Sequence, residues 1–384
     1  MANSRVLISG AGVAGPALAY WLVRRGFDVT VVERAPELRR AGYKVDVRGA
    51  ATEVLRRMGL LEAAQRADTG MRQITYVKSD GRPIAALPAD LLMGRRGDDL
   101  EIMRCDLSRL IYDATGNDVE YVFGDAIAGL RDGDVTFERR APQSYDYVVG
   151  ADGLHSNTRR LSMGDVPLRH LGAYISIFTV PNTLGIEREE IMYFRPGRLA
   201  FAYAMDPSEP ARVGLTFAAP AGSVGRGADA QKAALRAAFA GLGWRLDEFL
   251  AAMDHTDDFY FDSMSQVELP AWSKGRVALL GDAAHCPAPA SGQGSSLALV
   301  GAYVLGQHLG EPGGLTEYER RMRPYVEKNM AFGRQMAKDM VPGGRLSIAF
   351  RSYGMRTLKY HPRKEQVIDR ILAPMLDAAN AITL

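Results

Sequence analysis

The fold of this chain follows from the stretch Val6-Leu-Ile-Ser-Gly10-Ala-Gly12-Val-Ala-Gly15-Pro16-Ala-Leu-Ala-Tyr20. An apolar run leads into Gly-x-Gly-x-x-Gly and then into an apolar helix that we expect to end near Gly26. A second apolar run, residues 28–33, ends on the acid Glu33. Strand, glycine turn, helix, strand and acid in this order are typical of a βαβ unit that binds a dinucleotide.

Each residue type in this unit has a mechanical purpose. Gly10 allows the tight turn out of the strand, Gly12 lets the backbone approach a pyrophosphate, and Gly15 lets helix and strand pack closely. The helix N-terminus offers free N–H groups to the phosphates, and an acid about 20 residues later can accept the ribose hydroxyls. The predicted dinucleotide contacts here are Gly10, Gly12, Val13, Ala14, Gly15 and Glu33.

A secretory signal is the alternative interpretation, because residues 6–23 carry no charge and follow Arg5. Three glycines, a serine and Pro16 break the run where a signal needs a continuous apolar helix. A second uncharged run, residues 283–310, is interrupted by prolines and glycines, so it is not the continuous apolar stretch of roughly 20 residues that a membrane span needs. We therefore expect neither a signal peptide nor stable membrane insertion.

Composition narrows the function classes. The 384 residues predict two domains or one elaborated domain, and a net charge of +2 argues against nucleic acid as the main ligand. Cys105 and Cys286 cannot form a disulfide framework, which favours a reducing, cytoplasmic location. The six histidines show no metal-ligand spacing, so no metal site is expected.

The order of segments predicts an α/β fold: a Rossmann-like domain with an inserted antiparallel β-sheet domain and C-terminal helices. Segments 119–123, 135–137 and 145–149 are expected to extend the first sheet. Aromatic-rich strand patterns between 172 and 219 indicate the insertion, and a hairpin near 73–87 is assigned to it. The expected domains are nucleotide binding at 1–71, 97–171 and 268–340, substrate binding at 72–96 and 172–267, and a C-terminal helical segment at 341–384.

Two further motifs place acids and glycines after strands. Tyr147-Val-Val-Gly150-Ala-Asp152-Gly153 leads to Arg159 through a helix start. Gly281-Asp282-Ala-Ala-His285-Cys-Pro287-Ala-Pro289-Ala-Ser-Gly292-Gln293-Gly294 leads into an apolar helix. Because open α/β sheets bind ligands at the carboxyl ends of their strands, we expect both motifs to meet the first one there.

In these motifs the chain resembles the single-component FAD-dependent aromatic hydroxylases, the group of p-hydroxybenzoate hydroxylase, and is similar to the tetracycline-inactivating monooxygenases. The resemblance rests on the first glycine triplet with Glu33-Arg34, on Asp152-Gly153 with Arg159, and on Gly281-Asp282 with Pro287. It spans residues 6 to about 310, and we match no motif after residue 340.

The resemblance implies roles for individual residues in FAD binding. Glu33 would hold the adenosine ribose with Arg34 beside the adenine, Arg104 would reach the pyrophosphate, and Asp282 would bind the ribityl chain. The residues implied near the flavin ring are Asp46, Pro289, Gly292, Gln293 and Gly294, with Gly281 beside Asp282. Asp152 and Gly153 would contact both FAD and NADPH (or NADH), and further NADPH contacts are expected at Arg39 and Arg159.

One position departs from the pattern. Many relatives carry an asparagine two residues after the third glycine, where this chain has Ser296 after Ser295. A hydroxyl can still donate or accept a hydrogen bond there, so flavin binding is expected to survive. His285 is expected to be a packed histidine and Cys286 a small buried filler, and no catalytic side chain is named.

Aromatic and sulfur side chains alternate along the inserted strands. Substrate-pocket candidates are Tyr193, Phe201, Tyr203, Met205 and Phe217, together with Pro289 beside the flavin. One face of a sheet packs a core and the other can line a cavity, but periodicity alone leaves open which face is which.

The resulting prediction is an FAD-dependent monooxygenase that consumes NADPH (or NADH). It inserts one oxygen atom from O₂ into an aromatic or polycyclic phenolic or enolic small molecule, polyketide- or antibiotic-like, through a flavin C4a-hydroperoxide that the resemblance implies. One alternative is a flavin-dependent halogenase, which is disfavoured because Trp21, Trp244 and Trp272 form no halogenase signature. The others are another flavin oxidoreductase and a non-catalytic flavoprotein that sequesters a flat ligand. The sequence does not decide between hydroxylation and Baeyer–Villiger oxidation. It also does not give the oligomeric state.

Overall fold

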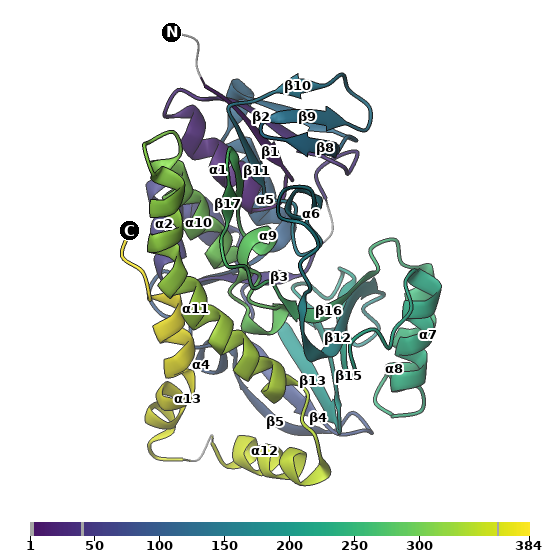
Figure 1. The fold of residues 1–384 in the computed structure, drawn as a ribbon. Helices are drawn as coiled ribbons and strands as arrows, with labels where there is room; N and C mark the ends of the chain where they lie inside the picture. Colours follow the sequence, from purple (N-terminus) through teal and green to yellow (C-terminus); the bar gives the residue numbers. More distant parts are fainter. Residues whose placement is uncertain (1–3, 40–41, 359–360) are drawn as a thin grey trace.

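A parallel sheet forms the centre of the molecule in this computed structural model, which describes residues 4–39, 42–358 and 361–384. Its six strands run in the order β17-β18-β11-β1-β2-β7, with only the short edge strand β17 antiparallel to its neighbour; β17, β11, β1 and β2 are labelled in Figure 1. The strands are β1 (Arg5–Ser9), β2 (Asp28–Glu33), β7 (Val119–Phe123), β11 (Tyr147–Gly150), β17 (Ser273–Lys274) and β18 (Val277–Leu279).

Apolar layers cover both faces of this sheet, which explains why its strands are continuous apolar runs. Val6 and Ile8 join the core under α1 (Ala14–Val23) and α10 (Gly294–His308), whereas Leu7 points to the opposite face. Helices α1 and α10 pack closely, since a Cβ atom on Gly306 would lie 2.6 Å from Cβ of Trp21.

The expectation that 135–137 extends the central sheet is wrong. That segment is β9 (Asp134–Phe137), the middle strand of a separate antiparallel sheet with β8 (Ile127–Arg131) and β10 (Gln143–Ser144). A short connection at 132–133 folds β9 back onto β8, and Val135 and Phe137 then pack across Leu7 and Val148. The backbone of β9 makes its hydrogen bonds within this local hairpin, so the strand does not need to pair with β7 at the edge of the central sheet.

A seven-stranded sheet forms the second layer, in the order β16-β12-β15-β14-β13-β4-β5. Its strands are β4 (Gln73–Val77), β5 (Pro83–Pro88), β12 (Arg169–Val180), β13 (Glu189–Arg195), β14 (Arg198–Ala204), β15 (Ala211–Ala218) and β16 (Tyr260–Gln266). The hairpin β4–β5 comes from a distant part of the chain and joins β13 in parallel, so the sheet is mixed at this junction.

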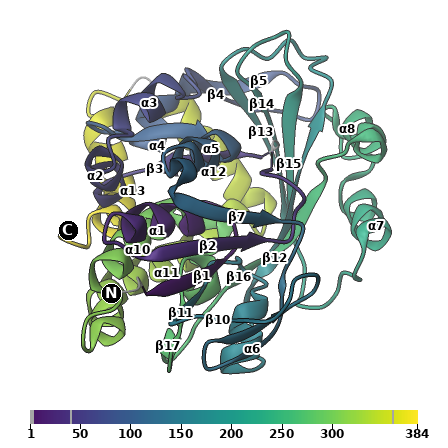
Figure 2. The same cartoon turned by 90° about the horizontal axis from the view of Figure 1, so that it is seen from above.

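The two faces of the seven-stranded sheet meet different partners. Helices α7 (Ala228–Phe239) and α8 (Leu246–Ala252) cover its outer face, while the inner face looks toward the central parallel sheet (Figure 2). The sheet is therefore a wall that separates the nucleotide-binding layer from the α7–α8 pair.

Helices close the fold at its C-terminal end. The long helix α11 (Gly314–Met340) buries Tyr318, Met322 and Tyr325 against the central domain, as its periodicity predicts, and α12 (Arg345–Leu358) and α13 (Lys364–Ala379) follow. Among the described residues, no helix is both long enough and apolar enough to cross a membrane. The remaining elements are β3 (Lys44–Val47), β6 (Leu100–Met103), α2 (Ala50–Arg57), α3 (Leu61–Arg66), α4 (Ala89–Met93), α5 (Arg104–Asp113), α6 (Asn157–Met163), α9 (Asp282–His285) and the 3₁₀ turns η1 (Gly116–Asp118), η2 (Met253–His255) and η3 (Pro289–Ser291).

Candidate cofactor site

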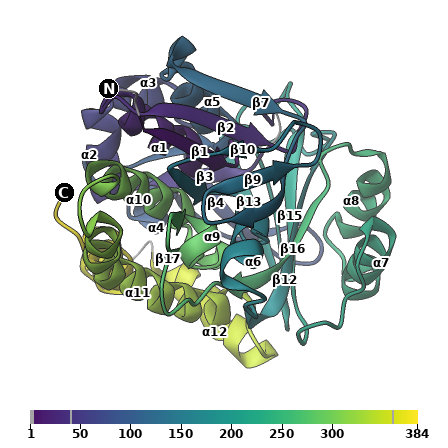
Figure 3. The same ribbon diagram turned by 45° about the horizontal axis from the view of Figure 1, so that its top comes forward.

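The three predicted motifs meet at one edge of the central sheet. They follow β1, β11 and β18, which are neighbours in the sheet, at their carboxyl ends. Gly10 has φ +109°, and a Cβ there would lie 2.6 Å from the carbonyl oxygen of Ala151. A Cβ on Gly281 would lie 3.2 Å from Cβ of Ala14, and helices α6 and α9 also lie together here (Figure 3). The turns are thus packed against one another through their glycines.

The glycines of the first turn do different work. A Cβ on Gly15 would lie 1.9 Å from the backbone oxygen of Gly10, so this residue lets α1 sit directly on the turn. A Cβ on Gly12 would meet only Nη2 of Arg104, at 3.4 Å. The contact of Gly15 is structural, whereas Gly12 faces the guanidinium that the family resemblance implies at the pyrophosphate.

Glu33 lies at the end of β2, beside the same turn. Its carboxylate accepts hydrogen bonds from the backbone N–H groups of Ala11 and Ala35, both at 2.9 Å. Arg34 and Arg39 are exposed nearby. The acid is therefore fixed at the mouth of the glycine turn, where a ribose would pass between it and the phosphates.

Asp282 opens the short helix α9 and points toward the start of α10. A Cβ on Gly294 would lie 3.6 Å from Oδ1 of Asp282. Burial raises the pKa of this carboxyl, and the guanidinium of Arg104 partly opposes that shift. Asp282 and Arg104 therefore bring a carboxylate and a guanidinium to one site, suited to sugar hydroxyls and phosphate respectively.

Gln293 provides a direct test of whether a ring fits at the third turn. Its side chain is 1% exposed, yet neither amide atom has a hydrogen-bond partner among the described residues. Buried amides are nearly always hydrogen-bonded, so the polar edge of a bound isoalloxazine would complete this position. Gly292 adjoins it with φ +63°, and a Cβ there would lie 3.5 Å from Oδ2 of Asp46. The residues present therefore fit FAD.

Ser296, the departure from the family pattern, keeps a structural role. Its hydroxyl accepts a hydrogen bond from the backbone N–H of Arg48 at 3.3 Å and donates one to the backbone oxygen of Asp46 at 3.5 Å. The serine therefore ties the first turn of α10 to strand β3, and its contact with the flavin stays a prediction.

A network of buried charges joins the two layers beside Asp46. Nζ of Lys44 on β3 lies 3.0 Å from Glu101 on β6 and 2.7 Å from Glu190 on β13. Burial lowers the pKa of Lys44, but the two carboxylates outweigh it and raise that pKa overall. The backbone N–H of Lys44 also donates to the hydroxyl of Tyr203 at 3.0 Å. Strand β3 is thus fastened to the seven-stranded sheet.

Sequence reasoning identified Asp46 in this network but missed its partners. Arg48 pairs with Asp46 at 2.8 Å, and Arg95 pairs with Glu101 at 2.8 Å. The alternating charges at 44, 46 and 48 in an extended segment were the available signal, because such residues share one face of a strand. The acids at 101 and 190 carry no local pattern, since only the fold brings them to Lys44.

The second motif is held together internally. The carboxylate of Asp152 accepts hydrogen bonds from the backbone N–H and the hydroxyl of Thr158, both at 2.9 Å, and from Ser156. Arg159 is buried and donates to the backbone oxygens of Ala283 at 2.9 Å and Leu154 at 2.7 Å. Gly153, with φ +82°, faces open space. Asp152 and Arg159 thus brace the turns, and NADPH contact by either of them stays a prediction.

The structure divides the five substrate-pocket candidates of the inserted sheet between its two faces. Phe201, Tyr203 and Met205 cluster with Met103 and Cys105, beside Arg104, on the inner face. Tyr193 and Phe217 lie on the outer face under α7 and α8, where the hydroxyl of Tyr193 donates to the backbone oxygen of Leu242 at 2.6 Å. Tyr203 is fully buried, with its hydroxyl accepting from the backbone N–H of Lys44, so we keep only Phe201 and Met205, together with Pro289 on η3, as pocket candidates.

Two tyrosines that the sequence analysis did not select also lie at this site. The rings of Tyr43 and Tyr260 are 5.9 Å apart. Burial raises the pKa of both hydroxyls, with Arg104 acting in the opposite direction and Asp282 adding to the rise. Both stay protonated at neutral pH. The hydroxyl of Tyr260 donates to Oδ2 of Asp262 at 3.4 Å, which leaves Tyr43 as the hydroxyl that can donate to a ligand oxygen.

His285 is a packed side chain. Burial lowers its pKa to about 4, its ring lies 4.8 Å from that of Trp272, and its Nε2 is 3.4 Å from the hydroxyl of Tyr318. Burial likewise raises the pKa of the Cys286 thiol well above its usual value, so this cysteine stays a thiol. Neither residue has the properties of a general acid or a nucleophile at neutral pH.

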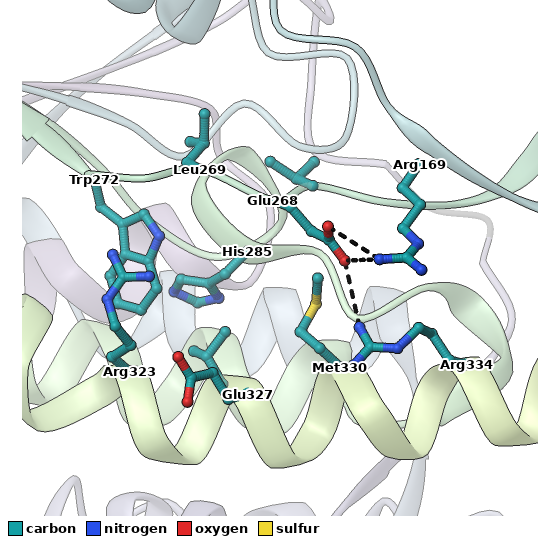
Figure 4. A pocket seen from close by; sticks show the side chains of 11 residues that line it. Arg169, Glu268, Leu269, Trp272, His285, Arg323, Glu327, Met330 and Arg334 are labelled. Atoms are coloured by element: carbon teal, nitrogen blue, oxygen red, sulfur yellow. Dashed lines mark hydrogen bonds and ion pairs between the residues drawn. The ribbon is translucent and has the colours of Figure 1, made fainter.

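A separate cavity of about 280 Å³ lies between α11 and the segment after β16 (Figure 4). Glu268 pairs there with Arg169 at 3.0 Å and Arg334 at 3.3 Å, and Arg323 lies over the ring of Trp272. None of the predicted cofactor residues lines this cavity. It is distinct from the site formed by the three turns.

An ion pair between the layers links the second motif to the wall. Nε2 of His155, just after Gly153, lies 3.0 Å from Oδ1 of Asp262 on β16. The hydrogen bond to Asp262 raises the pKa of His155 above its ordinary value. Sequence analysis gave no indication of this contact, because the two residues are more than 100 positions apart.

The stabilising effect of this pair should depend on pH. Because the pKa of His155 is raised in the folded state, its contribution is complete below about pH 6.5 and is lost as pH rises through the folded-state pKa. Thermal melts of wild type and His155→Gln should therefore differ at low pH and converge at high pH. The exposed His255 in η2 gives the matched control His255→Gln. A constant difference across the pH range would contradict the role of the ion pair.

The comparisons with known proteins agree with this geometry. A model of the FAD binding domain family matches residues 3–339. An uncharacterized protein of Mycobacterium tuberculosis is 42% identical over 88% of this chain and 94% of its own length. A flavin-dependent monooxygenase of Legionella longbeachae is 34% identical over 100% of this chain and 98% of its own. The crystal structure of tetracycline destructase Tet(55) has a TM-score of 0.85, with 33% identity, 100% coverage of this chain and 98% of its own.

These likenesses cover the whole of both layers. They confirm the predicted fold class, the family resemblance, FAD as the cofactor and monooxygenase as the enzyme class. From the converging turns, the position of Gln293 and the match over residues 3–339, the chain belongs to the FAD binding domain family of flavin-dependent monooxygenases.

Proposed function

We propose that this monooxygenase inserts one oxygen atom from O₂ into an aromatic or polycyclic phenolic or enolic small molecule, with NADPH (or NADH) as the reductant. The observation that carries the proposal is the inner face of the seven-stranded sheet. Phe201, Tyr203 and Met205 cluster beside Arg104, so a flat apolar ligand would lie between this face and the turns that hold FAD. The similarity to a tetracycline destructase supports a polycyclic, antibiotic-like substrate.

The chain's own residues would divide the work as follows. Glu33, Arg104 and Asp282 bind ribose, pyrophosphate and ribityl chain, and the N-terminus of α1 adds its dipole to the phosphate contact. Bound FAD, once reduced, supplies the activation of O₂. The inner-face side chains orient the substrate and exclude water, which would otherwise divert reducing equivalents to peroxide.

Hydrogen bonds from tyrosine would orient the substrate oxygen. Tyr43 and Tyr260 keep their protons at neutral pH because burial raises their pKa. Since the hydroxyl of Tyr260 donates to Asp262 at 3.4 Å, a phenolic or enolic oxygen would accept from Tyr43, which turns its electron-rich carbon toward the flavin. Such a donor selects for an oxygen substituent over a purely apolar ring.

The nicotinamide cofactor would bind transiently at the exposed side of the second motif. Gly153 faces open space, and Arg39 is exposed and can meet a phosphate. The unpaired thiols of Cys105 and Cys286 suit a reducing compartment, and we place the enzyme in the cytoplasm.

The test is anaerobic mixing of the FAD-loaded enzyme with NADPH across a panel of phenolic polycycles, followed by turnover under ¹⁸O₂. A true substrate should accelerate flavin reduction by roughly tenfold or more and leave with one labelled oxygen atom. Tight binding with no stimulated NADPH oxidation by any ligand would favour a sequestering flavoprotein, and halide-dependent product would favour the halogenase alternative.

Two phenylalanines on opposite faces provide matched variants for this assay. Phe201→Ala on the inner face should raise KM by about tenfold, the loss of one aromatic contact, and should lower the melting temperature less than Phe217→Ala, because Phe201 is half-buried and Phe217 is buried. Phe217→Ala on the outer face should lower the melting temperature and leave KM unchanged, because it empties the core under α7. Equal KM values in the two variants would contradict the assignment of the inner face to the substrate site.

A further inference from the structure

The exposed large apolar side chains of the described residues are all in the last two helices. On α12, Leu346 is 88% exposed, Phe350 81% and Tyr353 68%, and on α13 Val367 and Ile371 are also exposed. Helix α12 lies across one end of the molecule, away from the central sheet (Figure 1). Contiguous apolar side chains left in solvent mark an interaction surface.

The exposed side chains of α12 form one stripe, which is not the face that attaches the helix. At about 100° per residue, Leu346, Phe350 and Tyr353 fall within roughly 60° of one another. The attaching face carries Ile348, Arg351, Ser352 and Met355, which pack on Tyr76 and Phe194 of the seven-stranded sheet. The guanidinium of Arg351 lies 4.8 Å from the ring of Phe194. The helix is thus anchored on one side and presents the apolar stripe on the other.

The charged residues of α12 itself all have one sign, and the nearest acids in the sequence are Asp339 before the helix and Glu365 after it. From residue 340 to residue 364 the sequence contains no Asp or Glu and six Lys or Arg. Arg345 and Arg356 are exposed, and helical spacing places both beside the same edge of the stripe. This face therefore combines apolar side chains with an acid-free, basic flank.

We propose that α12 is a docking helix for the surface of an anionic lipid bilayer. An interfacial helix lies in the plane of the membrane with Leu and Phe among the acyl chains and Lys or Arg near the headgroups, as the stripe and its flank would allow. Docking is peripheral and reversible, and it places the substrate-binding sheet next to the phase in which flat, apolar compounds accumulate.

A second copy of this chain fits the face less well. In a two-fold symmetric contact the same patch meets itself, so Arg345 and Arg356 of one copy would face like charges of the other. No acid on this helix is available to compensate them. An anionic bilayer complements both the apolar stripe and the charge.

The experiment is co-sedimentation of the FAD-loaded enzyme with sucrose-filled vesicles. Vesicles of phosphatidylcholine with about 30% phosphatidylglycerol should bind the wild type roughly tenfold more tightly than phosphatidylcholine alone, and high salt should weaken that binding. Leu346→Ser with Phe350→Ser should lower binding at least tenfold, and Arg345→Glu with Arg356→Glu should abolish the preference for the anionic lipid. Arg131→Glu with Arg226→Glu, two exposed arginines elsewhere, is the matched charge control and should bind as wild type.

Melting temperature and FAD content should be unchanged in all variants, since the altered side chains are exposed. Wild type that does not sediment with anionic vesicles at low salt would overturn the proposal, as would stripe variants that bind like wild type. A wild-type dimer in solution that Leu346→Ser with Phe350→Ser converts to a monomer would also overturn it, because the stripe would then be a self-association surface.

Discussion

An Asp282→Ala enzyme is expected to leave purification as a colourless apoprotein. Asp282 lies at the carboxyl end of β18 with its Oδ1 directed at the start of α10, where the flavin's ribityl chain would pass. Loss of charge-assisted hydrogen bonds worth about 3 kcal/mol corresponds to at least roughly 100-fold weaker binding of FAD. The absorbance ratio of flavin to protein after gel filtration, followed by titration with FAD, measures the effect.

The conservative variant separates charge from shape. Asp282→Asn keeps an acceptor oxygen and the same volume, so it should retain part of the FAD that Asp282→Ala loses. Both variants should keep the far-ultraviolet circular dichroism of the wild type, because the site is assembled by glycine contacts rather than by this carboxylate. A yellow Asp282→Ala protein with full flavin content would refute the assignment.

Gly15→Ala should fail to fold stably, whereas Gly12→Ala should fold and bind FAD poorly. At residue 15 the new methyl would lie 1.9 Å from a backbone oxygen of Gly10, which cannot move without separating α1 from β1. The cost should exceed about 4 kcal/mol, the range of severe core disruption. At residue 12 the methyl meets only the flexible end of Arg104, at 3.4 Å, in the space that the pyrophosphate needs.

The measurements are urea unfolding for stability and flavin retention for binding. The expected pattern is a sharp loss of unfolding free energy in Gly15→Ala and near wild-type stability with reduced FAD affinity in Gly12→Ala. Equal stability of the two variants would contradict the division of labour between the two glycines, and normal FAD affinity in Gly12→Ala would contradict the backbone approach.

The sequence was sufficient for the parts of the site that local patterns encode. A strand followed by glycines and an acid recurs around Gly10, Asp152 and Asp282, and parallel strands must bring their carboxyl ends to one edge. The order of these motifs along the chain therefore predicted the convergence that the sheet order β18-β11-β1 shows. The apolar stripe of α11 is another local pattern, because Tyr318, Met322 and Tyr325 recur at steps of four and three residues and are buried.

Contacts between residues that are far apart in the chain could not be predicted from the sequence. Nothing near Glu190 indicates that it meets Lys44 across the two layers, and His155 gives no sign of Asp262. Alternation along β13, β14 and β15 marked two faces, but the core under α7 and the cluster beside Arg104 are equally apolar. Only the packing of helices on one side decides which face receives the ligand. The strand at 135–137 was misplaced for a similar reason, since edge and hairpin partners share one pattern.

The fastening of Lys44 to Glu190 and Tyr203 has a consequence for engineering. Asp46, two residues along the same strand, adjoins Gly292 at the turn that would hold the flavin. Strand β3 therefore connects the seven-stranded sheet directly to the cofactor site. A chimaera that grafts a relative's inserted sheet onto this chain must carry an acid at 190 and a phenol at 203. Without them Lys44 would keep only Glu101 as a carboxylate partner, β3 would lose its ties to the inserted sheet, and a change of substrate preference would be accompanied by a disturbed flavin site.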